Sequence, residues 1–340
     1  LRLIPRELRL RGSEEPVEVT VRKALEKGYI MMEWMAYFMA LAKRFLEELG
    51  VPAEKQRFIE KLEWERAHYS IQGYDQEVWT ERWGWVEVSG HNYRTDYDLG
   101  RHMRWSGADL TAFKEFKEPR KVVELSVRPD AEAIKEDFGD RAREVLKAIS
   151  RADAGALARE LEEKGSVRLG PYELTKRHLS VVKVERVEKG RHFVPHVIEP
   201  SFGLDRLVYI TLEYAYTVRD GRIVLRLPRD LAPIQVAVLP LLSRDGLPEK
   251  AREVYNLLLA EGFEVEYDES GSIGRRYARC DEIGIPIAIT VDHRTLEDDT
   301  VTLRDRDTWR QVRAPIAELS SLLSAYFRKK LEFEELGEPV

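Results

Sequence analysis

Cysteine is nearly absent from this sequence of 340 residues, and its scarcity excludes two kinds of structure. With Cys280 as the single cysteine, the chain has neither an intrachain disulfide nor a cysteine-rich zinc site. Scarce cysteine is natural in a reducing compartment, so we expect a cytoplasmic location. No apolar run approaches the length of a membrane-spanning helix. Residues 31–42 come nearest, but they are too few and include Glu33. We therefore expect no membrane partner.

Several motifs of well-known chemistry are also missing. The seven histidines show no His-Glu-x-x-His pattern or other metal-ligand spacing, so we expect no metal ligands in the chain. There is no phosphate-binding loop, no dinucleotide fingerprint and no Gly-x-Ser-x-Gly elbow of a serine hydrolase. The net charge of -6, from 55 basic and 61 acidic residues, excludes a polycation. Nucleic-acid binding would therefore need a local basic patch.

What the sequence does contain is ample apolar material, 43% of its residues, and its length predicts one to three domains. Apolar residues recur at helical spacing over residues 31–49, and Gly50 ends this predicted helix. Residues 82–90 alternate with a period of two, which predicts a strand. This period places on one face Trp83, Trp85, Glu87 and Ser89, and on the other face Val86 and Val88.

Changes in pattern along the chain indicate three parts. Residues 121–193 are charge-rich and are expected to form an inserted subdomain with short helices. Residues 1–120 and 194–227 then belong to one domain. From about residue 234 strands alternate with helices, which predicts a small α/β domain at residues 232–340 with a mostly parallel sheet. The last stretch, residues 308–329, reads as one long helix.

The segment from His196 to Leu207 is the most informative one. It predicts a strand, a tight turn and a helix, and Glu199 and Ser201 share one face of the strand. A carboxylate beside a hydroxyl could bind a small ammonium group. Arg206 lies in the first helical turn, where a cation opposes the helix dipole. Either Arg206 faces an anion such as a phosphate, or it pairs with a nearby carboxylate, and the sequence leaves both open.

A second polar stretch runs from Arg94 to Leu99 and includes Asp96 and Asp98. Two carboxylates two residues apart near a turn could bind a divalent ion or cap a helix. Capping is the commoner role.

Arginines gather in the C-terminal part, near a glycine-rich turn and further downstream. Those we expect on a basic face that binds a folded RNA are Arg275, Arg276, Arg279, Arg304 and Arg310. Tyr277 and Trp309 lie among them in the sequence and could stack on bases. The alternative is a solvated face whose arginines pair with acidic neighbours such as Asp305 and Asp307.

These segments together resemble a known family. His196–Leu207, with its form Glu-Pro-Ser-Phe-Gly-Leu-x-Arg, resembles the third signature motif of class II aminoacyl-tRNA synthetases, in particular that of glycyl-tRNA synthetases. Other segments are similar to the same family in the same order, and the resemblance spans nearly the whole chain. They are Glu63-x-Glu65-x-Ala67-His68-Tyr69, Gly84-Trp85-x-Glu87, Arg94–Leu99, Gly274–Arg279, Asp281–Gly284 and Thr302–Asp307.

The resemblance implies a fold, an activity and roles for single residues. The fold is an α+β part of the class II catalytic domain, an antiparallel sheet with helices, followed by a small α/β anticodon-binding domain. The activity is attachment of glycine to tRNA(Gly) through a glycyl-adenylate, with ATP and Mg²⁺. By position, Glu199, Pro200 and Ser201 would line the glycine pocket, Arg206 would meet the ATP triphosphate, and Glu87 with Val88 would contact ATP.

The chain also departs from the family's pattern. Neither the first nor the second class II motif is found, and the sequence starts at Leu1. We therefore expect a C-terminal part of a longer enzyme, inactive alone. The complete enzyme would be a homodimer, or a partner chain would supply the N-terminal portion. The alternative is a non-catalytic tRNA-binding paralogue or accessory subunit of the same fold.

Overall fold

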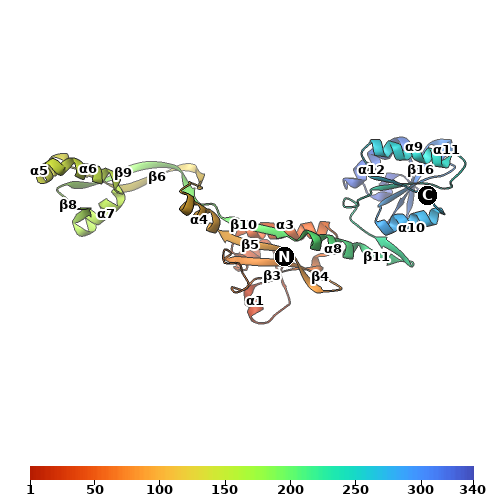
Figure 1. The fold of residues 1–340 in the computed structure, drawn as a ribbon, viewed down its shortest axis with the longest axis horizontal. Helices are drawn as coiled ribbons and strands as arrows, with labels where there is room; N and C mark the ends of the chain where they lie inside the picture. Colours follow the sequence, from red (N-terminus) through yellow and green to blue (C-terminus); the bar gives the residue numbers. More distant parts are fainter. The chain divides into compact units, whose positions relative to one another are not determined.

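The computed structural model describes residues 1–340 and divides them into two compact units. One unit comprises Leu1–Asp98 and His196–Val340, and the other comprises Leu99–Pro195. Figure 1 shows their elements. The inserted unit is thus longer than residues 121–193, because the ribbon that leads into it already begins at Ala112. None of the helices is long and apolar enough to cross a membrane.

The first unit begins with a six-stranded sheet in the order β10-β5-β4-β3-β1-β2. All its pairings are antiparallel except that of β1 with β3. The strands are β1 (Arg2–Ile4), β2 (Val17–Glu18), β3 (Gln56–Glu60), β4 (Gln72–Thr80), β5 (Gly84–Thr95) and β10 (Val197–Phe202). The helices of this part are α1 (Arg6–Leu10), α2 (Val21–Glu26), α3 (Glu33–Glu48) and α8 (Leu204–Ala215), and α4 (Tyr97–Ser106) begins at its end and continues into the other unit.

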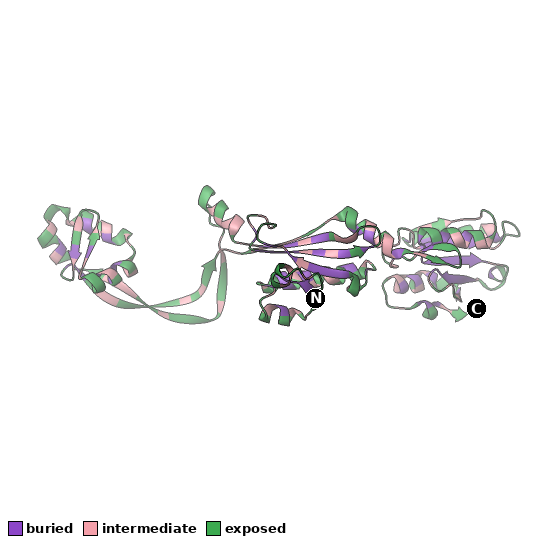
Figure 2. Cartoon of the chain, turned by 90° about the horizontal axis from the view of Figure 1, so that it is seen from below, coloured by how far each residue is buried: buried purple, intermediate pink, exposed green.

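Helix α3 covers one face of this sheet, as its apolar spacing predicted. Met35 and Met39 pack with Phe58, Tyr74 and Tyr93 of the strands in one buried cluster. Val88 lies in a second cluster with residues of α3 and α8. The other face of the sheet is not covered by α3 or α8 and carries polar side chains, among them Asp75, Asn92 and Glu199. Figure 2 shows the buried residues concentrated in the strands.

Strand β5 corrects one expectation. Its pairing with β4 shifts at Val88, because Gln76 lies opposite Ser89 whereas Glu77 lies opposite Glu87. The extra residue of this bulge breaks the period of two. Ser89 is therefore buried, hydrogen-bonded to Gln76 at 2.7 Å, while Glu87 remains exposed. The prediction that Ser89 shares the face of Glu87 was wrong.

The unit Leu99–Pro195 is a two-stranded ribbon that ends in a small packed domain. The ribbon consists of β6 (Ala112–Pro129) and β9 (Leu179–Phe193), paired antiparallel. The domain consists of α5 (Ala131–Phe138), α6 (Ala142–Arg151), α7 (Ala154–Lys164), β7 (Ser166–Leu169) and β8 (Tyr172–Thr175). Its core includes Ile134, Val145, Leu161 and Leu174.

The C-terminal domain is built on a second six-stranded sheet, in the order β14-β13-β15-β16-β17-β18. Its elements are the hairpin β11 (Tyr216–Arg219) and β12 (Arg222–Leu225), then β13 (Val236–Pro240), α9 (Leu247–Ala260), β14 (Val265–Tyr267), α10 (Ile273–Ile283), β15 (Ile287–Val291), α11 (Thr295–Asp298), β16 (Thr300–Asp305), β17 (Gln311–Pro315), α12 (Leu319–Phe327) and β18 (Glu338–Pro339). The expected α/β domain is present.

Two details of this domain differ from expectation. Only β13, β14 and β15 are parallel, and the remaining pairings are antiparallel. A parallel connection needs a crossover of a dozen or more residues, and the links around β16 are too short for one. The second difference is that residues 311–315 form β17, where Val312 and Ala314 alternate into the core. The single long helix predicted at 308–329 is therefore wrong, and α12 begins at Leu319.

The boundary of the C-terminal domain also lies earlier than residue 232. The guanidinium of Arg306 donates to the backbone oxygen of Leu227 at 2.7 Å and to that of Gly284 at 2.9 Å. Gly284 fits closely against this segment, since a Cβ atom there would lie 3.0 Å from the oxygen of Leu225. The hairpin β11–β12 is therefore packed against the C-terminal domain.

Candidate active site

The register of the first sheet places the polar residues of β10 on its free face. Glu199 lies opposite Asn92, and Ser201 lies opposite Gly90. On β4, Gly90 in turn faces Asp75. Directly paired residues point to the same side of a sheet, so these side chains share one surface. The shared face of Glu199 and Ser201 agrees with the sequence prediction.

Pro200 does not share this surface. It alternates to the opposite side of β10, where it lies with Phe202 and Leu207 against α3. Successive side chains of a strand point to opposite faces, so the side chain of Pro200 does not lie beside those of Glu199 and Ser201. The expectation that Pro200 lines a glycine pocket with them is therefore corrected.

Arg94 is the residue that fixes Glu199. Its Nη1 donates to Oε2 of Glu199 at 2.7 Å, while Nε and Nη2 donate to Asp98 at 2.8 and 2.7 Å. The guanidinium also lies 3.9 Å from the ring centroid of Tyr69. Two carboxylates acting on one guanidinium raise the pKa of Arg94, first through Asp98 and then through Glu199. Sequence reasoning named both Glu199 and the stretch that begins with Arg94, but it did not pair the two residues, since 105 residues separate them.

Arg206 lies at the start of α8 and turns toward β5. Its Nη1 donates to the backbone oxygen of Glu87 at 2.7 Å and lies 3.6 Å from the carboxylate Oε2. Both side chains are about half exposed. Gly203, the N-cap residue of α8, has no side chain that could accept hydrogen bonds. The first backbone N–H groups of α8 therefore remain available as donors. The pair leaves Arg206 accessible, and a helix start of this kind attracts anions.

Val88 contributes nothing through its side chain. That side chain is buried among Leu46, Leu207 and Ile210, on the helix-covered side of the sheet. Its backbone oxygen accepts a hydrogen bond of 3.0 Å from the amide of Gly203. Only Glu87 of the predicted pair therefore presents its side chain outward.

Asp75 is a further carboxylate of this surface that the sequence did not reveal. A Cβ atom on Gly90 would lie 3.7 Å from Oδ1 of Asp75 and 3.9 Å from Oε1 of Glu87, so both carboxylates converge over that glycine. Burial raises the pKa of Asp75, and Glu87 adds to the rise, while the Lys61 ammonium at 3.0 Å opposes it. Register alone could have found Asp75, since it lies across from Gly90.

Gly73 and Asn92 form another part of the surface. A Cβ atom on Gly73 would lie 2.7 Å from Oδ1 of Asn92, closer than real side chains approach. Glycine at position 73 therefore leaves space for the side-chain amide of Asn92. Asn92 is directly opposite Glu199 in the pairing of β5 with β10.

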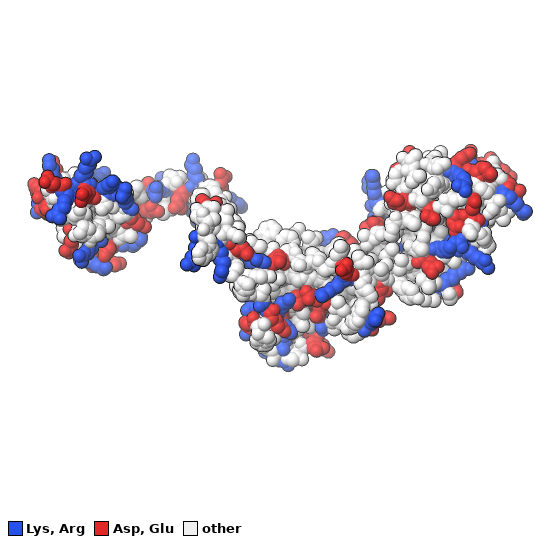
Figure 3. All heavy atoms as spheres, in the orientation of Figure 1, with Lys and Arg blue, Asp and Glu red and all other residues white.

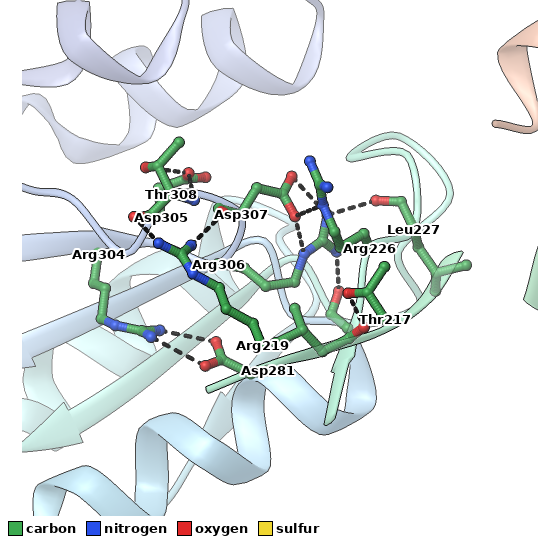
Figure 4. Close-up of polar contacts among 12 residues, drawn as sticks. Thr217, Arg219, Arg226, Leu227, Asp281, Arg304, Asp305, Arg306, Asp307 and Thr308 are labelled. Carbon is green, nitrogen blue, oxygen red and sulfur yellow. Dashed lines mark hydrogen bonds and ion pairs between the residues drawn. The ribbon is translucent and has the colours of Figure 1, made fainter. Parts of the chain in front are cut away.

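In the C-terminal domain the structure separates the five candidate RNA-binding arginines. Arg304 is buried and makes a bidentate pair with Asp281 at 2.8 and 3.0 Å, as Figure 4 shows. Arg276 is also buried, and it donates to the backbone oxygens of Glu269 and Gly271, each at 2.7 Å. Both side chains are enclosed, so their assignment to a tRNA surface was wrong. The guanidinium groups of Arg276 and Arg304 make their hydrogen bonds inside the protein and so stabilise the fold.

The other three arginines remain on the surface. Arg275 is exposed. Arg279 is exposed and donates to Asp268 at 2.8 Å, and exposed Arg310 donates to Glu334 at 3.0 Å. The alternative of a solvated, paired face thus applies to Arg279 and Arg310. Trp309 is half-buried, and the guanidinium of Arg219 lies 4.2 Å from the centroid of its ring.

Comparison with known proteins finds one matching domain family and relatives along the whole chain. Residues 235–326 match the family described as the anticodon binding domain. The chain is 50% identical over 341 residues to the glycine–tRNA ligase of Aeropyrum pernix, covering 100% of the chain and 58% of that relative. It is 47% identical over 324 residues to that of Pyrococcus horikoshii, covering 94% of the chain and 56% of the relative. A solved structure of prolyl-tRNA synthetase from Cryptosporidium parvum, complexed with L-proline and AMP, can be superimposed with a TM-score of 0.47 and 15% sequence identity. The superposition includes 92% of this chain and 47% of the synthetase chain.

The matched anticodon-binding domain and the curated relatives make the chain similar to aminoacyl-tRNA synthetases. Within that class the chain is similar along its whole length to glycine–tRNA ligases, as the motif around Glu199 predicted, and this prediction is confirmed. The chain spans little more than half the length of these relatives.

Proposed function

We propose that this chain is part of a class II ligase that attaches glycine to tRNA(Gly) through a glycyl-adenylate made from ATP. One observation carries the proposal. Glu199 and Ser201 occupy the same free sheet face as Glu87, which holds Arg206 at the start of α8. An amino-acid site and a phosphate site thus adjoin on one surface. The whole-length similarity to glycine–tRNA ligases supports the assignment.

Glycine would bind where Glu199, Ser201 and Asp75 face the same side. With one oxygen of Glu199 engaged by Arg94, the other oxygen is available to an ammonium group. The Ser201 hydroxyl beside it is exposed and can accept or donate a hydrogen bond. Glycine has no side chain to grip, so selection would rest on fixing the ammonium and leaving no room for a methyl group.

ATP would place its phosphates near Arg206 and the amides that begin α8. A guanidinium together with free helix amides suits a polyphosphate, and it would stabilise charge as the glycine carboxylate attacks the α-phosphate. Mg²⁺ usually reaches such sites through one or two carboxylates together with substrate phosphates. Glu87, beside Arg206 and half exposed, is the carboxylate that would serve it.

The tRNA would contact the C-terminal domain, where Arg275 is exposed and Arg279 and Arg310 could exchange their acidic partners for phosphates. We also propose a cytoplasmic location, where charged tRNA is used, and a homodimer for the complete enzyme. The non-catalytic alternative gains no support from the sheet face, because a binding paralogue has no need of Glu199, Ser201 and Arg206 together.

The test is glycine-dependent exchange of pyrophosphate into ATP, followed by glycylation of tRNA(Gly). The chain is assayed alone and together with the complementary segment, which we define as the part of the Aeropyrum pernix ligase outside the match. We expect activity only with both. A matched control carries Glu199→Gln and Arg206→Ala together. Absence of glycine-dependent exchange in a well-formed mixture would contradict the proposal, and so would equal activity of the control.

A further inference from the structure

Helix α4 carries exposed aromatic and basic residues close to the candidate active site. Asp98, in its first turn, binds Arg94, which in turn binds Glu199. The helix continues from there to Trp105, seven residues further and about 10 Å along its axis. Trp105 is 80% exposed, and Arg104 beside it is exposed as well. A single exposed apolar side chain is ordinary, so the surroundings of Trp105 decide what it indicates.

The ribbon that follows α4 supplies further aromatic groups. It begins at Ala112, six residues after the last residue of the helix. Phe113 of β6 is 51% exposed and lies opposite His192 of β9, with the two ring centroids 5.0 Å apart. Phe193, the next residue of β9, is also exposed. Exposed rings therefore occur at the end of α4 and again at the start of the ribbon.

The neighbouring pair of the ribbon brings two cations together. Lys114 lies directly opposite Arg191, and both are exposed. Like charges directly opposite each other on paired strands destabilise the pairing. Neither side chain forms an ion pair that would offset this repulsion. A bound anion would remove the cost, so the pair favours a ligand of negative charge.

The balance of charge around these residues is positive as well. Residues 99–195 contain 21 Lys and Arg against 17 Asp and Glu, although the whole chain has a net charge of -6. Between Asp98 and Glu115 the single acidic residue is Asp109, whose carboxylate accepts hydrogen bonds from the amide and the hydroxyl of Thr111. Figure 3 shows an uncharged surface at α4 with Lys and Arg side chains beside it. A positive unit in an acidic protein can attract an anionic polymer locally.

Exposed rings interspersed with cations are the features with which proteins bind single-stranded nucleic acid, since the rings stack on unpaired bases and the cations contact phosphates. A base-paired stem offers no unstacked base to such a surface. An apolar protein segment would leave the cations without partners. The proposed function includes a ligand of the required kind, because the glycyl group must reach a ribose hydroxyl at the unpaired 3′ end of the tRNA.

We propose that Arg104, Trp105, Phe113, Lys114 and Arg191 form a surface, here called the α4–ribbon surface, that binds the unpaired 3′ end of the tRNA. The inference rests on the proposed function, and it adds a contact for the tRNA besides the C-terminal domain. The two rings stack on the unpaired bases, and the three cations contact the phosphates. Because α4 begins at the candidate active site, an RNA strand bound here is directed toward the glycine.

The test compares two transcripts of tRNA(Gly), one complete and one without its last three nucleotides. Each is titrated by filter binding with the full chain mixed with the complementary segment. The parent should bind the complete transcript about tenfold more tightly than the shortened one. Trp105→Ala should bind both alike, whereas Trp105→Phe should keep most of the difference. Lys114→Ala should lower the salt dependence by about one phosphate contact.

The matched control is Val187→Ala, at a residue of β9 that is 61% exposed and lies outside the α4–ribbon surface. This variant should bind both transcripts as the parent does. Glycine-dependent pyrophosphate exchange needs no tRNA, so it should stay unchanged in all of these variants.

The proposal is wrong if the parent binds both transcripts equally, or if Trp105→Ala keeps the preference of the parent. It is also wrong if Trp105→Ala abolishes assembly with the complementary segment but not transcript binding, which would assign the surface to a protein partner. An equal fall in binding and in pyrophosphate exchange would show that Trp105 only supports the fold. Absence of exchange in the parent contradicts the proposed function instead, because transcript binding is measured without catalysis.

Discussion

Arg94 donates from Nη1 to Oε2 of Glu199 at 2.7 Å, and the two residues lie 105 positions apart in the sequence. Asp98 binds the other edge of the same guanidinium, and Tyr69 lies under it. Asp98 and Tyr69 thus hold Arg94 in one orientation, and Arg94 holds Glu199. The carboxylate that we assign to glycine is positioned by contacts outside its own strand.

The first prediction concerns this support. Asp98→Asn leaves Arg94 with a weaker partner and lets Glu199 move. We expect the KM for glycine to rise about tenfold, the equivalent of about 1.4 kcal/mol, with little change in the KM for ATP. Pyrophosphate exchange by the chain together with the complementary segment measures both. Equal changes in the two KM values would indicate general loss of structure instead.

The second prediction concerns Glu199 itself. Glu199→Gln removes the charge proposed to bind the glycine ammonium while keeping the size of the side chain. The loss should be about 2–4 kcal/mol in glycine use, because a charged group then lacks its partner. ATP binding, measured by equilibrium dialysis, should stay nearly normal. An unchanged glycine dependence would show that Glu199 does not face the substrate.

The third prediction concerns Arg206. Arg206→Ala removes the exposed guanidinium at the start of α8, and we expect adenylate formation to fall by roughly 10²–10³. Binding of tRNA should be unaffected, since we place it on the C-terminal domain. Filter binding and pyrophosphate exchange measure the two properties. Arg226→Ala, on a surface arginine bound to Asp307, is the matched control.

The fourth prediction separates a buried arginine from an exposed one. Arg304→Ala leaves the buried carboxylate of Asp281 unpaired, so the domain should lose about 3–5 kcal/mol of unfolding free energy. Arg275→Ala should change stability by less than about 0.5 kcal/mol. At low salt it should nonetheless weaken tRNA binding and reduce the salt dependence by about one phosphate contact. Urea unfolding and binding titrations decide between these roles.

The fifth prediction concerns acid stability. His91 is fully buried, and burial lowers its pKa to about 4. In the unfolded chain a histidine has a pKa of about 6.5, so between these values only the unfolded state binds the proton. Stability is complete above about pH 6.5 and falls as the pH drops toward 4. We expect His91 to account for about 2–3 kcal/mol of loss by pH 4.5.

The measurement for His91 is urea unfolding at pH 7 and 4.5, followed by the fluorescence of the tryptophans on β4 and β5. The variant His91→Gln keeps a hydrogen-bonding group near Ser89 but does not titrate. It should lose less stability than the parent chain over the same interval. Equal losses would mean that carboxylates alone cause the acid sensitivity.

Much of the fold could be predicted because its signals are local. The apolar spacing over residues 31–49 predicted α3, and the alternating pattern after residue 234 predicted the α/β domain. The sequence of β10 and the turn after it also placed Glu199, Ser201 and Arg206, since strand alternation and a helix start depend only on neighbouring residues. The similarity to glycine–tRNA ligases could be recognised from the same short segments.

Long-range pairing decided the remainder. The bulge at Val88 arises from the register with β4, and it moved Ser89 into the core. Arg276 and Arg304 look like surface charges in the sequence, yet Arg304 meets Asp281 only after α10 packs beside the sheet. Arg94 meets Glu199, and Asp75 joins the face of Ser201, only through the pairing of strands. The sequence by itself determined which groups are available, whereas the tertiary structure decided which are buried and which meet, because burial and pairing depend on residues far apart along the chain.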